Sequence, residues 1–133
     1  MITRVSTHIA HGSIEVDLPV KIESALNLRE HHMKRAKRVK EQRTAVFYSL
    51  ANFRKILALI VASQKRIIVT FTRLAPRSLD SHDNLRAGFK ACADQVADML
   101  GLDDRDPRID WRYKQERSRT YSARVAIEAG GEG

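Results

Sequence analysis

Aspartate residues gather at both ends of one predicted helix in this chain of 133 residues. Asp80 and Asp83 precede the helical segment, and Asp103, Asp104 and Asp106 follow it. Carboxylate oxygens are the ligands that Mg²⁺ prefers in proteins, and bound Mg²⁺ can hold and polarise a phosphate group. The chain carries 24 Lys and Arg against 16 Asp and Glu, so clustered acids are unexpected in it. The cluster predicts a divalent-metal site.

The helix between these acids carries a second charged feature. On a helical wheel, Asp83, Lys90 and Asp94 lie within about 60° of one another, opposite an apolar stripe. Lys90 and Asp94 are four residues apart, the spacing of a surface ion pair. Two interpretations stay open. The face is either an ordinary solvated surface, or it places a lysine beside a metal-bound phosphate.

A basic surface is predicted on the first long helix. Five of seven consecutive residues are cationic, namely Lys34, Arg35, Lys37, Arg38 and Lys40. We expect the two others, Ala36 and Val39, to face the core. Clustered cations neutralise phosphates and release counterions, which gives salt-dependent binding without base specificity. The pattern predicts DNA binding, above all by Lys34, Arg35, Lys37 and Arg38, and its alternative is a merely solubilising face.

Several arginines lie near the acidic loops, where they could hold DNA against the repulsion of the carboxylates, although each alone could equally be a solvated arginine. We rank Arg77 first among them, ahead of Arg73, Arg86 and Arg105. His82, beside Asp83, is a candidate general base or phosphate contact, although a lone loop histidine is usually neither.

Three other residues are expected to pack rather than to react. Cys92 lies on the apolar stripe of the helix and behaves as a small hydrophobe there. Trp111 and Tyr113 alternate along one face of a predicted strand, and core packing is a better expectation for them than base stacking.

Six elements are predicted to position these residues. They are a strand over 13–22, one long or two abutting helices over 30–59, a central strand over 66–74, a helix over 83–100, and strands over 109–115 and 121–129 that look like a hairpin. Pro19 indicates an edge or the end of the first strand. The order predicts an α+β fold, a mixed sheet covered by two main helices. Residues 1–129 form one domain, and 130–133 are expected to be a flexible tail.

The helical segment raises a geometric problem for the acids. A helix from Asn84 to Met99 is roughly 24 Å long, and the five residues after it cannot cover that distance. Three solutions stay open. The helix begins late, the chain bends back, or an antiparallel dimer brings Asp104 of one subunit to Asp83 of the other.

Composition excludes several classes of protein. The single cysteine excludes a disulfide framework and a Cys-rich zinc site. The longest apolar run, 56–62, is far below the roughly 20 residues of a spanning helix. The N-terminus lacks the features of a secretory signal, so we expect a cytoplasmic protein. The net charge of +8 favours polyanionic partners, nucleic acid first and an anionic membrane surface second.

The order of these residues resembles the RusA family of Holliday junction resolvases. That family carries a D-x-D-N-L type motif, a lysine and an aspartate four apart on the next helix, and an aspartate pair in the turn after it. The matching residues are Asp80 to Leu85 (DSHDNL), Lys90, Asp94, and Leu102-Asp103-Asp104. The resemblance covers roughly half of the chain. Pro19 and residues 25–29 give a weaker match to a segment ahead of the family's first helix.

The resemblance implies a homodimeric, Mg²⁺-dependent endonuclease that cuts four-way DNA junctions in a bacterial or phage-infected cell, without a small-molecule cofactor or a membrane. It assigns Asp80, Asp83 and Asp104 as metal ligands and Lys90 as their electrostatic partner. Supporting roles fall to Asn84, Asp94 and Asp103, where Asn84 orients the loop and Asp94 holds Lys90.

Two departures separate the chain from the family pattern. Ser81 stands where the family has its first aspartate, with Asp80 one residue further away, and Lys90 follows Asp83 by seven residues instead of about four. A catalytically inactive, RusA-like DNA-binding protein is therefore the alternative. A basic RNA-binding or membrane-surface protein is a third interpretation.

Overall fold

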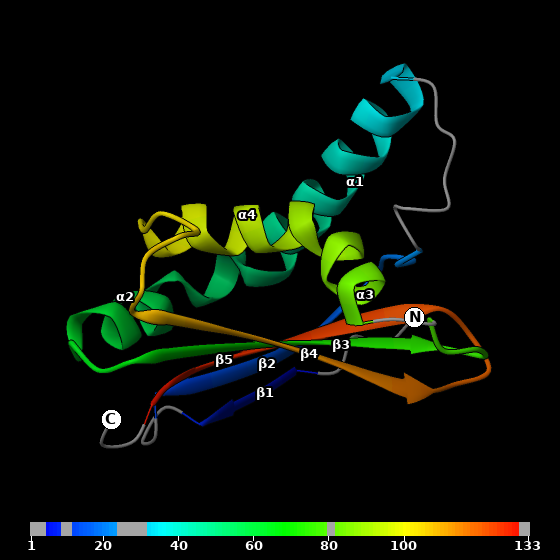
Figure 1. Ribbon diagram of the computed structural model, residues 1–133. Coiled ribbons are helices and arrows are strands. Elements are labelled where there is room, and N and C mark those ends of the chain that lie inside the picture. The colour runs from blue at the N-terminus through cyan, green and yellow to red at the C-terminus, as the bar shows by residue number, and fades with distance from the viewer. Residues whose placement is uncertain (1–4, 9–11, 24–31, 80–81, 131–133) are drawn as a thin grey trace.

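Five strands form one mixed sheet, and the helices lie on one side of it (Figure 1). The computed structural model describes residues 5–8, 12–23, 32–79 and 82–130, without the side chains of 5–8 and 83. The strands are β1 (Val5–His8), β2 (Ser13–Leu18), β3 (Ile67–Ala75), β4 (Ile109–Arg117) and β5 (Ser122–Ala129). The helices are α1 (His32–Leu50), the 3-10 turn η2 (Ala51–Phe53), α2 (Arg54–Ala62), α3 (His82–Gly88) and α4 (Lys90–Leu100). The predicted α+β class is confirmed.

The sheet has the strand order β1-β2-β5-β3-β4. β3 pairs in parallel with β4 and antiparallel with β5, so it lies between the last two strands. The predicted hairpin of 109–115 with 121–129 is therefore wrong. Ile67, Val69 and Phe71 of β3 are fully buried, and a strand of this kind needs hydrogen-bonded neighbours on both edges. Alternation within the segments that form β4 and β5 cannot reveal that a third strand separates them.

Strand ends follow the chemistry of proline and glycine. β2 stops before Pro19, as one of the two predicted roles of Pro19 requires, so residues 19–22 of the predicted strand lie outside it. β3 stops before Pro76 in agreement with the prediction, because proline lacks the N–H that a ladder requires. β1 was not predicted.

Gly130 is buried, and its N–H donates to the carbonyl of Arg66, so the expected flexible tail does not begin at residue 130. Residues 131–133 lie outside the described part of the chain.

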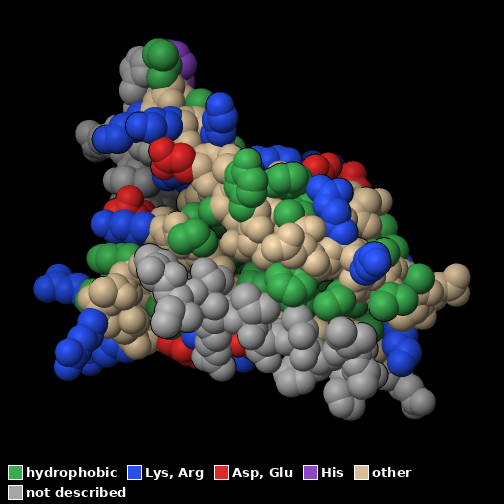
Figure 2. Space-filling view, turned by 180° about the vertical axis from the view of Figure 1, so that it is seen from behind, with side chains coloured by type: hydrophobic (Ala, Val, Ile, Leu, Met, Phe, Trp, Pro, Cys, Tyr) green, Lys and Arg blue, Asp and Glu red, His purple; other side chains and the backbone are tan. Residues whose placement is uncertain are grey.

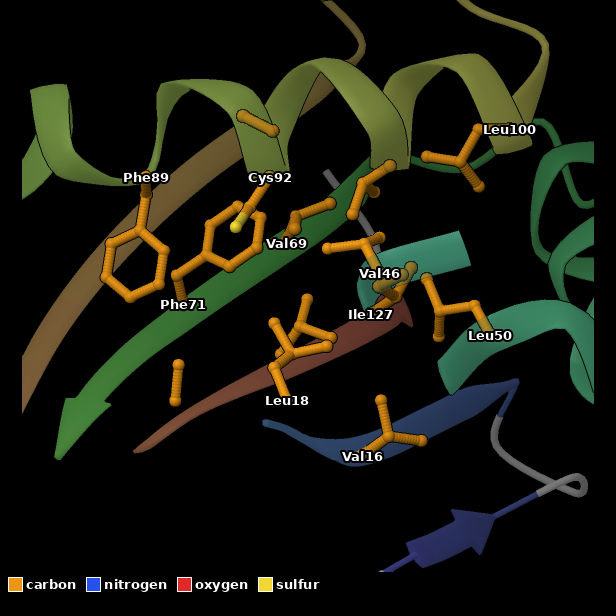
Figure 3. Packing of buried hydrophobic residues seen from close by; sticks show 14 of the residues in the cluster. Val16, Leu18, Val46, Leu50, Val69, Phe71, Phe89, Cys92, Leu100 and Ile127 are labelled. Carbon is orange, nitrogen blue, oxygen red and sulfur yellow. The ribbon is translucent and has the colours of Figure 1, made fainter. Parts of the chain in front are cut away.

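The core lies between the sheet and the helices (Figure 3). Val16, Leu18, Phe71 and Ile127 point from the sheet toward the helices. The facing side chains come from α1 and α4 and from the turn that joins α3 to α4, namely Val46, Leu50, Phe89, Cys92 and Leu100. Full burial of each large aliphatic or aromatic side chain stabilises the fold by about 1.5–3 kcal/mol. The helical spacing of the residues from α1 and α4 places their side chains on the face that packs against the sheet.

The first helical region consists of two abutting helices joined by η2, one of the two predicted arrangements. Its first half stands clear of the sheet (Figure 1), and burial in α1 begins only at Gln42. The expectation that Ala36 faces the core is therefore wrong, since Ala36 is exposed. The apolar spacing in the sequence extends to Ala36, but this part of the helix does not lie over the sheet.

The same helical region, His32–Ala62, contains an 18-residue window with a mean hydropathy of 1.5, long and apolar enough to cross a membrane by length and composition alone. Only 22% of that window is buried within the fold. Core helices of soluble proteins pass the same test, so this is weak support for a membrane segment. Leu57 and Ile60 of α2 pack into the core of the domain.

Candidate functional site

The predicted second helix is broken in the middle. α3 ends at Gly88 and α4 begins at Lys90, with buried Phe89 between them at φ −94° and ψ 2°. Gly88 lies against Ile22 and Glu23, where an added Cβ would come within 2.8 Å of Ile22 Cγ2 and 2.9 Å of the Glu23 carbonyl oxygen. The helix breaks at the point where Gly88 packs closely against the segment that follows β2. It also makes Lys90 the first residue of a new helix.

The chain reverses direction immediately after α4. Gly101 adopts the left-handed conformation, with φ 71° and ψ 26°. The N–H groups of Gly101 and Leu102 donate to the carbonyls of Asp98 and Ala97, which closes the helix end. Trp111 of β4 then holds the returning chain, because its Nε1 donates to the Asp104 carbonyl oxygen at 3.0 Å. These bonds direct Asp104 back along α4.

Lys90 connects the two acidic regions of this part of the fold. Its Nζ lies 2.7 Å from Asp94 Oδ1 and 2.8 Å from Asp104 Oδ2. The reversal at Gly101 brings Asp104 back to Lys90 within one chain, whereas the predicted distance from Asp83 to Asp104 involves a side chain outside the described residues. The hydrogen bond to Asp104, followed by that to Asp94, raises the pKa of Lys90 above its ordinary value. The hydrogen bond from Lys90 lowers the pKa of the Asp104 carboxyl.

These residues line a surface hollow of about 490 Å³, which we call the acid hollow. Its charged side chains are four aspartates and three cations, namely Asp94, Asp98, Asp103, Asp104, Arg43, Lys90 and Arg105. The aspartates come from α4 and from the turn after it, whereas Arg43 comes from α1. The hollow therefore gathers residues from three separate segments.

The structure leaves part of the predicted metal site undescribed. Asp80 lies outside the described residues, and the backbone of Asp83 belongs to α3 but its side chain is not described. Of the three predicted ligands, only the carboxylate of Asp104 is placed. Within the described part of the chain, no three His, Cys, Asp or Glu side chains are grouped to hold a metal ion.

The neighbouring predicted residues lie between α3 and β4. The ring of His82 meets that of Tyr113 edge-on, with centroids 6.0 Å apart, and Asn84 is half-buried. Burial raises the pKa of the Tyr113 hydroxyl. Trp111 and Tyr113 stack with Phe71 at 6.1 Å and 6.0 Å, and Cys92 is fully buried. Packing roles were predicted for these three residues, and the structure confirms them.

The predicted basic surface covers the free half of α1. Lys34, Arg35, Lys37 and Lys40 are exposed, and Arg38 is half-buried. Figure 2 shows Lys and Arg side chains gathered on the projecting end of the molecule that α1 forms. Because this end has few core contacts, its cations are presented to solvent as the pattern predicted.

The predicted arginines do not behave alike. Arg77 is exposed in the loop after β3. Arg73 is only 5% exposed, and its guanidinium donates to the carbonyls of Ile22 and Arg77, each at 2.7 Å. The expectation that Arg73 contacts DNA is wrong, because its nitrogen atoms join two loops within the fold.

Arg43 and Gln95 are the residues of this region that the sequence interpretation missed. Arg43 Nε donates to Gln95 Oε1 at 3.0 Å, and this bond joins α1 to α4 beside the acid hollow. Arg43 borders the apolar stripe of α1, three residues before Val46. That position suggests a residue at the edge of the buried face of the helix. No sequence signal identifies the helix that it contacts.

No family model and no curated protein matches the chain in sequence comparison. The resemblance to the RusA family therefore rests on the order and spacing of the motif residues.

Proposed function

We propose that this chain is a Mg²⁺-dependent, structure-selective endonuclease of RusA type that cuts four-way DNA junctions. The observation that carries the proposal is the contact of Lys90 with both Asp94 and Asp104 in the acid hollow. A cation between carboxylates, close to a strongly basic helix, suits chemistry on a phosphate diester. The RusA-like order of the same residues supports this choice of reaction.

Asp104, together with Asp80 and Asp83, would hold the metal. The fit can be tested for Asp104, whose carboxylate has the oxygen donors that Mg²⁺ prefers and has a lowered pKa, so it is ionised at neutral pH. Bound Mg²⁺ would activate water for in-line attack and stabilise charge on the phosphate.

Lys90 would neutralise negative charge that develops on the scissile phosphate. Its raised pKa keeps the ammonium protonated at neutral pH. Asp94 lies one helical turn away on α4 and retains the ammonium when Asp104 is otherwise engaged. Asn84 orients the loop in this proposal, and the backbone N–H of Arg105 donates to Asp103 Oδ1, which supports the turn.

Binding to the DNA backbone falls to Lys34, Arg35, Lys37, Arg38 and Arg77. Contacts of this kind are made to phosphates and carry no base information, so they suit an enzyme that selects for branch shape. We propose a homodimer in the cytoplasm, since a four-way junction presents two symmetry-related strands for cleavage and a twofold dimer would supply two sites.

The alternative is a catalytically inactive RusA-like protein that binds DNA. Its support is Ser81, which stands where the family has an aspartate, so that the ligand set depends on Asp80. In that case the basic surface of α1 keeps its role and the acid hollow has none in catalysis.

Incubation of the purified protein with a labelled four-way junction and MgCl₂ tests the proposal. We expect paired nicks near the branch with the wild type and loss of cleavage with Asp104→Asn. Asp110→Asn is the matched control, because Asp110 pairs with Arg112 on β4 and lines no part of the acid hollow. Absence of cleavage across pH and metal ions, with junction binding intact, would favour the inactive alternative.

A further inference from the structure

We infer that Arg43 is a phosphate-binding residue of the acid hollow, an assignment that rests on the proposed function. Arg43 belongs to α1, the helix that carries the basic surface, and its side chain lines the hollow formed by α4 and the following turn. It is therefore the residue at which the DNA-binding helix reaches the proposed reaction site.

The orientation of Arg43 is fixed by a neutral partner. Arg43 Nε donates to Gln95 Oε1, and Gln95 is only 8% exposed. A guanidinium is planar, so a bond at Nε also sets the plane of the two terminal nitrogen atoms. Gln95 directly follows Asp94, which holds Lys90. The two cations are thus positioned by adjacent residues of α4.

The positive charge of Arg43 is not neutralised by a carboxylate of the described residues. Lys90 contacts two aspartates, whereas Arg43 makes no ion pair with any residue that the structure describes. Arg105, the third cation of the hollow, is exposed and lies on a turn. Arg43 is therefore the cation of the hollow that is both held in place and available to an anion.

A phosphate diester needs such a residue here. The four aspartates of the acid hollow repel it, and Lys90 already compensates part of their charge. The two terminal nitrogens of a guanidinium match two phosphate oxygens, which gives a charge-assisted and geometrically specific contact. Arg43 would hold the phosphate while Asp94 keeps Lys90 in place beside it.

Two measurements on a four-way junction test this assignment. One is the single-turnover cleavage rate with MgCl₂, and the other is the salt dependence of the dissociation constant without metal. The variants are Arg43→Gln, Arg43→Lys and Gln95→Met. Lys55→Gln is the matched control, since Lys55 is an exposed cation of α2 outside the acid hollow.

We expect Arg43→Gln to slow cleavage by about 10-fold or more and to reduce the slope of log affinity against log salt by about one. Gln95→Met should slow cleavage with less change in the slope, because the charge of Arg43 remains. Wild-type cleavage and slope in Arg43→Gln, or an equal loss in Lys55→Gln, overturns the assignment. If circular dichroism shows Arg43→Gln unfolded, the cleavage criterion alone applies to Arg43→Lys, which keeps the charge but not the fork, and wild-type cleavage in that variant overturns the assignment.

The slope also separates this inference from the proposed function. If the wild type binds junctions but never cuts them, the nuclease proposal fails, and a reduced slope in Arg43→Gln still supports phosphate binding at Arg43. An unchanged slope overturns it. If the wild type does not bind the junction, both are overturned.

Discussion

The ammonium group of Lys90 lies 2.8 Å from a carboxylate oxygen of Asp104, a residue fourteen positions further along the chain. This contact crosses a helix and a chain reversal, so it depends on the correct fold of both. The Lys90 and Asp104 side chains are 63% and 35% exposed, which makes the pair accessible to solvent and to a ligand. A pair of this kind contributes little to stability and is well placed for function.

The ion pair between Lys90 and Asp104 predicts a dependence of stability on pH. The pKa of Asp104 is lowered, so its contribution is present above the ordinary value of 3.8 and is lost as pH falls through the folded pKa. The pKa of Lys90 is raised, so its contribution is present below 10.5 and is lost as pH rises through the folded pKa. We expect Asp104→Asn to lower the melting temperature slightly at neutral pH and to have no effect in strong acid. An effect of equal size at both pH values would contradict the proposed role of the pair in stability.

Trp111 offers a direct test of metal binding. It is the single tryptophan of the chain, and its indole N–H donates to the Asp104 carbonyl. We expect MnCl₂ to quench Trp111 fluorescence, because Mn²⁺ accepts the same oxygen ligands as Mg²⁺ and is paramagnetic. Asp104→Asn should abolish the quenching. NaCl at equal ionic strength is the control, and quenching that persists in Asp104→Asn would place the metal elsewhere.

Arg73 and Arg77 are predicted to affect different properties. Arg73→Met leaves the buried carbonyl of Ile22 and that of Arg77 without their donor, so urea denaturation should show a loss of about 2–4 kcal/mol. Arg77→Ala removes an exposed cation and should leave stability unchanged within about 0.5 kcal/mol. Junction binding should weaken in Arg77→Ala at low salt. The prediction fails if Arg73→Met is as stable as the wild type.

Gly88 is predicted to be intolerant of a side chain. In Gly88→Ala the new Cβ would meet Ile22 and the Glu23 backbone at under 3.0 Å, so the segment after β2 must move. We expect a loss of about 1–3 kcal/mol in the free energy of unfolding. Gly101→Asn is the matched control, because no atom lies within 4 Å of its Cβ position and Asn tolerates the left-handed conformation. Equal stability of Gly88→Ala and wild type would show that this contact is loose.

Cys92 is predicted to be chemically silent in the folded protein. Burial raises the pKa of its thiol to about 12, so almost no thiolate exists at pH 8. A thiol-specific reagent at pH 8 should label Cys92 only at the rate at which the protein unfolds. Rapid labelling without denaturant would contradict the burial of Cys92 in the core. Wild-type protein in urea serves as the positive control.

Local sequence patterns predicted much of the secondary structure. Alternation in 13–22, the β-branched run before Pro76 and the stop at Gly101 each depend on the preferences of neighbouring residues, and the structure contains the corresponding elements. The exposed cations of α1, the burial of Cys92 and the packing of half-buried Trp111 against the core follow from the same patterns. These features needed no knowledge of distant contacts, because burial periodicity is a local property.

Tertiary structure decided the rest. The insertion of β3 between β4 and β5 and the burial of Arg73 arise from contacts between residues far apart in the sequence. So do the partnership of Arg43 with Gln95 and the approach of Asp104 to Lys90. The sequence by itself determined which charges the chain carries and on which elements. Their meeting in one hollow required the break at Phe89 and the reversal at Gly101, because only packing against the sheet selects among the directions that a chain can take after a helix ends.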